Sequence, residues 1–125
     1  MKLLLDTHVV LWAFTADSRL FGRAKDAILD ARNVVFVSAA SAWAISIKKA
    51  LGKLDAPDDF LEEVLRHRFT PLAISCEHAL LAGRLPPLHT DPFDRMLVAQ
   101  SIHDRLTLVT ADKRLPPYRC SLLPL

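Results

Sequence analysis

The sequence contains little glycine and little cysteine, and both shortages exclude classes of protein. Its three glycines, Gly22, Gly52 and Gly83, are far apart, so no glycine-rich phosphate loop exists and the P-loop and Rossmann motifs are absent. The two cysteines, Cys76 and Cys120, lack CxxC or histidine-rich spacing. The sequence therefore indicates neither a zinc finger nor a disulfide framework.

Long apolar runs and a strong excess of one charge are also missing. No run approaches the ~20 apolar residues that a membrane-spanning helix needs. The first six residues reach an acidic side chain too soon for a signal peptide. We therefore expect no membrane association and a cytoplasmic location. The formal net charge of +2 is too small to predict a nucleic-acid partner by itself.

What remains is the composition of an ordinary folded domain. Apolar residues make up 51% of the chain and charged residues 24%, which argues against disorder. A chain of 125 residues is large enough to bury about two-thirds of its unfolded surface in one core. No linker, internal repeat or low-complexity segment interrupts it. We expect a single domain spanning residues 1–125.

Short apolar or β-branched segments alternate with segments of helical spacing. Strands are expected at residues 3–5, 34–37, 69–74, 106–109 and 120–123. Helices are expected at residues 9–14, 23–31, 42–51, from 55–57 through 65, 77–83 and 92–102. This alternation predicts an α/β fold with a central, mainly parallel sheet covered by helices. Pro71 suits an edge strand, because proline donates no ladder hydrogen bond.

Three aspartates follow apolar strands or lie at the start of a helix: Asp6, Asp94 and Asp112. The carboxyl ends of parallel strands share one edge of a sheet, where ligands usually bind, so these distant residues can meet there. Two unit charges about 4 Å apart repel by roughly 4 kcal/mol at an effective dielectric constant near 20. A cation would relieve that repulsion, and the carboxylate oxygens favour Mg²⁺ or Mn²⁺.

Each aspartate also has a purely structural explanation. Asp6 could cap the first helix, and Asp112 could cap a turn. Asp94 would occupy the third position of a helix capped by Asp91, near the positive end of the helix dipole. The two effects at Asp94 would together contribute about 1 kcal/mol without any metal. The three acids in combination favour a metal site over three separate caps.

The histidines and serines are weaker candidates. None of the five histidines forms an i, i+4 pair typical of a zinc-binding helix, and only His8 and His89 lie near the aspartates in sequence. Ser38 and Ser41 are expected to cap a helix, since no GxSxG motif marks either as a nucleophile.

Four segments occur in an order and spacing that characterise a known family. They are LLLDTH at residues 3–8, VSAASAWAI at residues 37–45 with Lys48, DPFDRMLVAQ at residues 91–100 and LTLVTAD at residues 106–112. On these segments the chain resembles PIN-domain ribonucleases, among them the VapC-like toxins of bacterial toxin–antitoxin pairs. The resemblance extends over essentially the whole chain.

This resemblance implies a PIN-like three-layer α/β/α sandwich and a Mg²⁺- or Mn²⁺-dependent endoribonuclease toxin. It implies that Asp6, Asp94 and Asp112 are catalytic and bind the metal, with Thr110 in support and Asp91 in a capping or supporting role. It also implies an RNA substrate, a cognate antitoxin as partner and a homodimer.

One residue departs from the family pattern. The family normally has a glutamate directly after the tryptophan of the Ser-Ala-Trp stretch, and this chain has Ala44. Ala44 shares a predicted helix face with Lys48, so a glutamate there could both bind metal and pair with the lysine. We therefore expect nuclease activity to be slow or absent in this chain.

Two alternatives follow. A PIN fold without catalysis could still bind RNA or the antitoxin. A haloacid-dehalogenase-like phosphatase also carries an aspartate after its first strand, but it needs a second aspartate two residues later. This chain has His8 at that position, which disfavours the phosphatase.

Overall fold

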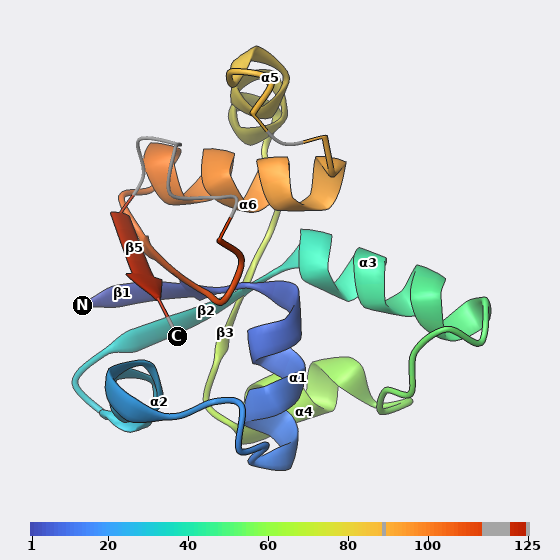
Figure 1. Cartoon of the computed structure of the whole chain (residues 1–125), viewed down its shortest axis with the longest axis vertical. Helices are drawn as coiled ribbons and strands as arrows, with labels where there is room; N and C mark the ends of the chain where they lie inside the picture. The colour runs from blue at the N-terminus through green and yellow to red at the C-terminus, as the bar shows by residue number, and fades with distance from the viewer. Residues whose placement is uncertain (89, 114–120, 125) are drawn as a thin grey trace.

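The computed structural model describes residues 1–88, 90–113 and 121–124 (Figure 1). The strands are β1 (Lys2–Leu5), β2 (Val34–Ser38), β3 (Thr70–Leu72), β4 (Thr107–Thr110) and β5 (Ser121–Pro124). The helices are α1 (Thr7–Thr15), α2 (Gly22–Leu29), α3 (Ala39–Ala50), α4 (Phe60–Arg66), α5 (Cys76–Arg84) and α6 (Pro92–His103). Within the described residues, no helix is long and apolar enough to cross a membrane.

All five strands form one parallel sheet in the order β3-β2-β1-β4-β5. At its centre, Leu4 of β1 is in register with Phe36 of β2 and Leu108 of β4. The predicted parallel α/β sheet is therefore confirmed. Pro71 lies in β3 at the edge of the sheet, as its missing N–H requires. The predicted strand at 120–123 corresponds to β5, while residue 120 lies outside the described residues.

Alternate residues of the strands separate the core into two apolar layers. Leu3 and Leu5 face one cluster, which they share with residues of α1, α2 and α4. Leu4 faces the other cluster, which includes Leu97 and Val98 of α6. Figure 1 shows α6 on one side of the sheet and α1, α2 and α4 on the other. The result is the predicted three-layer α/β/α arrangement.

Four helix boundaries differ by two residues or more from the sequence-based expectation. The helix α1 begins at Thr7 instead of Val9, because Asp6 caps it there. The helix α3 begins at Ala39 instead of Ala42, because the Ser38 hydroxyl accepts a hydrogen bond from the Ala40 N–H at 3.0 Å and caps the helix there. The helix α2 ends at Leu29 instead of Ala31, since the chain turns extended at Asp30.

The fourth difference is the start of α4, which begins at Phe60 instead of at residues 55–57. The Lys49 ammonium donates to the Ala56 carbonyl oxygen at 2.6 Å and also bonds the Asp58 carboxylate. These contacts tie the segment before α4 to the end of α3, so it runs as a loop.

Candidate active site

A pocket of about 380 Å³ opens at the point in the sheet where the order of the strands reverses. After β1 the chain builds β2 and β3 on one side, then returns to add β4 and β5 on the other. Ligands of open parallel sheets bind at such a switch point, outside the carboxyl ends of the strands. The structure brings Asp6, Asp94 and Asp112 together on the lining of this pocket, with Ala44 and Lys48.

The Asp6 carboxylate is buried, with 6% of the residue exposed, and its orientation is fixed by two hydrogen bonds. One oxygen accepts from the Thr7 N–H at 2.7 Å, and the other accepts from the Thr110 hydroxyl at 2.6 Å. The Thr110 hydroxyl in turn accepts from the Asp112 N–H at 2.9 Å. Asp6 therefore does cap α1, and Thr110 couples its position to that of Asp112.

The amino terminus of α6 brings two more acids to the pocket. Asp91 caps the helix, because its Oδ1 accepts from the N–H of Phe93 at 2.8 Å and from that of Asp94 at 3.3 Å. Pro92 occupies the first helical position, where no N–H is needed. Asp94 therefore lies in the first turn, where the helix dipole favours a negative charge. Both acids line the pocket.

The helix α3 contributes the opposite wall. The buried hydroxyls of Ser41 and Thr7 are 3.0 Å apart and hydrogen-bonded, which fixes α3 against the start of α1. Ala44 is 2% exposed and lines the pocket about one turn further along, followed by the exposed Lys48. A longer acidic side chain at position 44 would therefore extend toward the aspartates. Lys48 makes no ion pair with any residue that the structure describes.

The structure locates one of the two histidines that lie near the aspartates in sequence. His8 is exposed on α1 and lines the pocket. His89 lies outside the described residues.

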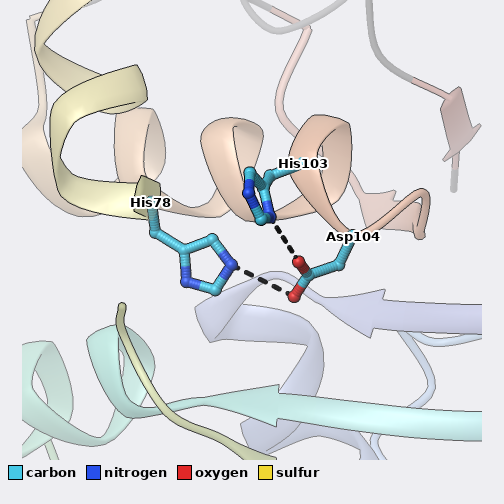
Figure 2. Close-up of side chains that lie close together, drawn as sticks. All are labelled: His78, His103 and Asp104. Atoms are coloured by element: carbon cyan, nitrogen blue, oxygen red, sulfur yellow. Dashed lines mark hydrogen bonds and ion pairs between the residues drawn. The ribbon is translucent and has the colours of Figure 1, made fainter. Parts of the chain in front are cut away.

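A second polar cluster, which the sequence analysis did not single out, lies at the other end of α6. Asp104 accepts hydrogen bonds from His78 of α5 at 3.1 Å and from His103 at 2.7 Å (Figure 2). Together with Asp104, the two histidines form a group whose potential ligand atoms all lie within 4.8 Å of one another. In the described part of the chain, this is the one group of three such residues. His78 and Asp104 are 26 residues apart, so only the packing of α5 on α6 reveals the cluster.

The hydrogen bonds of His78 argue against a metal in this histidine cluster. Its Nδ1 accepts from the Ser75 N–H at 3.0 Å, in a capping box whose other bond runs from the His78 N–H to the Ser75 hydroxyl at 3.1 Å. The ring proton of a neutral His78 is therefore on Nε2, which donates to Asp104. A metal would need that nitrogen unprotonated. We interpret the cluster as a structural link between α5 and α6.

The same link sets the ionisation of Asp104. Burial alone would raise the pKa of its carboxyl, but the hydrogen bonds from His103 and His78 outweigh burial. The pKa of Asp104 therefore lies below its ordinary value of 3.8.

Comparison with protein families identifies the fold. Residues 3–119 match the family model of the PIN domain. The chain belongs to the PIN domain family. Comparison of this PIN domain with curated proteins finds no significant match.

Solved structures with the same fold include three toxin–antitoxin assemblies. VapBC2 from Rickettsia felis, bound to a promoter DNA fragment, has a TM-score of 0.72 and 14% identity over 99% of this chain and 98% of its own. DNA-bound VapBC from Salmonella typhimurium has a TM-score of 0.70 and 15% identity over the same shares. A toxin–antitoxin complex from Klebsiella pneumoniae has a TM-score of 0.65 and 20% identity over 98% of both chains. At identities this low, the structural match shows a likeness of fold alone.

Proposed function

We propose that this PIN domain is a metal-dependent endoribonuclease of the VapC toxin type, whose catalytic and metal-binding residues are Asp6, Asp94 and Asp112. The observation that carries the proposal is their convergence: they come from the end of β1, the start of α6 and the segment after β4, yet they line one pocket. The resemblance of the surrounding segments to VapC-like toxins supports the same assignment.

The donors in the pocket suit a hard divalent cation. The carboxylates of Asp6, Asp94 and Asp112 offer only oxygen atoms, as Mg²⁺ and Mn²⁺ prefer. Such an ion, when bound, lowers the pKa of a coordinated water and polarises the scissile phosphate. The chain's own contribution is orientation: Thr110 and the Thr7 N–H hold the Asp6 carboxylate, and α6 presents Asp94 from its first turn.

The methyl group of Ala44 weakens the proposed site. It stands on the pocket wall where the resemblance implies a glutamate, so one negative charge and up to two oxygen ligands are missing. The nearby Lys48 adds a positive charge to the same wall. The missing acid and the charge of Lys48 both disfavour cation binding, and we propose that cleavage by this chain is slow or absent for this reason.

The proposed partners are an RNA substrate, a cognate antitoxin and a second copy of the chain, all in the cytoplasm. The solved neighbours include toxin–antitoxin complexes, which supports an antitoxin. An apolar row on α3 and its end supports a protein contact: Trp43 is 60% exposed, Ile47 37% and Leu51 63%. Exposed apolar rows of this kind are common at interfaces.

The decisive experiment restores the acid. We expect Ala44→Glu to cleave tRNA and mRNA in Mg²⁺ at least about tenfold faster than the unchanged chain, because the carboxylate completes the site. Cleavage should stop in EDTA. The matched control Ala44→Gln has the same shape without the charge and should rescue much less. Mg²⁺-dependent cleavage by the unchanged chain that Ala44→Glu fails to increase would contradict the proposal.

Ala44 also favours a second candidate, a PIN-fold module that binds RNA or antitoxin without chemistry. The same buffers separate the two functions. RNA or antitoxin binding by both proteins, with no cleavage by Ala44→Glu, would favour the binding module.

A further inference from the structure

Metal binding does not account for two aromatic side chains on the α1 side of the acid pocket. His8 and Trp12 lie one helical turn apart, and both line the pocket. Their ring centroids are 6.1 Å apart, with 29° between the ring planes. Trp12 is partly buried against the core, whereas His8 is exposed. The two rings form a stack whose inner member is fixed and whose outer member is accessible at the pocket.

A cation supports the inner ring of this stack. The Arg19 guanidinium carbon lies 5.0 Å from the centre of the Trp12 ring, within the range of a cation–π contact. Two hydrogen bonds to Asp17, at 3.0 Å from Nε and 2.7 Å from Nη2, hold that guanidinium in place. The inner ring of the stack is therefore held in place, which limits the side-chain entropy that Trp12 loses when a ligand binds beside it.

An aromatic pair at i, i+4 stabilises a helix wherever it occurs, so the pair alone indicates no ligand. Its position does. The stack lies on the lining of the pocket in which the acids would bind the cation and the scissile phosphate, and Lys48 provides a cation for a phosphate on the same lining. A flat ring beside a phosphate site matches the repeating base and phosphate of a nucleic-acid strand.

We propose that an unpaired nucleobase next to the scissile phosphodiester stacks on the ring of His8, which makes this ring a base-binding position beside the acid pocket. This inference rests on the proposed ribonuclease function. Bases within a duplex are stacked on both faces and cannot reach the ring, whereas bases in loops and single strands can. His8 is then a specificity-determining residue, with Trp12 as its support.

The test separates stacking from charge. The probes are a fluorescein-labelled 12-nucleotide oligo(A) and an abasic oligomer with the same number of phosphates. Binding of each is measured by fluorescence anisotropy in Mg²⁺, with the slow-cleaving Ala44 chain. We expect His8→Ala to weaken oligo(A) binding by about five- to hundredfold and to leave abasic binding unchanged. His8→Phe should retain the affinity for oligo(A), because it keeps an aromatic ring without the imidazole nitrogens.

The matched control is His103→Ala, an exposed histidine on a helix but away from the pocket, which should change neither affinity. An equal loss for both probes in His8→Ala would overturn the proposal, since His8 would then contact phosphates. Equal affinity of the unchanged chain for oligo(A) and the abasic oligomer would also overturn it. Failure to bind either probe would remove the proposed RNA function as well, which distinguishes the two failures.

Discussion

The polar clusters at the two ends of α6 differ in how many carboxylates they bring together. At the carboxyl end, a single carboxylate, that of Asp104, accepts hydrogen bonds from His78 and His103. At the amino end, about 18 Å away along the helix axis, the pocket gathers four aspartates and one lysine. Hydrogen bonds of this kind stabilise the packing of α5 on α6. Several carboxylates in one pocket stabilise a cation that enters it, which is why the proposed chemistry is assigned to that end.

The sharpest test compares the same substitution at the two ends of α6, each in the Ala44→Glu background. We expect Asp94→Asn to lower the cleavage rate at least about a hundredfold, because it removes a proposed metal ligand, with little change in unfolding free energy. Asp104→Asn should keep cleavage within about twofold while lowering the free energy of unfolding by about 1 kcal/mol. RNA cleavage and urea unfolding of both variants measure these effects. Equal losses of cleavage would break the distinction between the two clusters.

A smaller effect is expected from the hydroxyl that orients Asp6. Thr110→Val keeps the shape of the side chain but removes the bond to the Asp6 carboxylate. In the Ala44→Glu background, we expect the Mg²⁺ concentration for half-maximal cleavage to rise about tenfold. Thr110→Ser, which retains the hydroxyl, should behave like its parent. An unchanged Mg²⁺ requirement in Thr110→Val would show that the helix cap alone fixes Asp6.

The smallest effect concerns the histidine cluster and pH. Because the pKa of Asp104 is lower in the folded chain than its ordinary 3.8, its ionised form stabilises the fold above about pH 5. That contribution is lost as the pH falls through the folded pKa. The difference in unfolding free energy between the unchanged chain and Asp104→Asn should therefore shrink between about pH 5 and pH 3. A difference that stays constant over this range would contradict the assignment.

The sheet could be predicted from the sequence because its signals are local. Leu3–Leu5 and Val34–Val37 are short apolar runs, and the acids lie within two residues of a strand end or in the first turn of a helix. The same alternation of strands and helices implied parallel strands, and parallel strands brought the acids to one edge. Residues far apart in the chain could thus be assigned to one pocket without coordinates.

The features that escaped prediction depend on contacts between distant segments. Two serines could have capped α3, and Ser38 takes that role while its hydroxyl also donates to Gln100 at 2.6 Å, 62 residues away. Ser41 instead meets Thr7 across the start of α1. The histidine cluster likewise requires α5 to lie on α6. No local pattern in the sequence records such pairings.

Because residue 44 is buried, the proposed catalytic activity can be lost without a loss of stability. Asp6 is part of the scaffold as well as of the proposed site, so its loss would uncap a helix and leave the Thr110 hydroxyl without its acceptor. Alanine at position 44 has no such obligations: it is the best helix former, and its methyl group avoids placing a charge in a 2% exposed position. Replacing a glutamate by alanine at this position would remove the proposed activity while leaving the domain as well folded as before, or better.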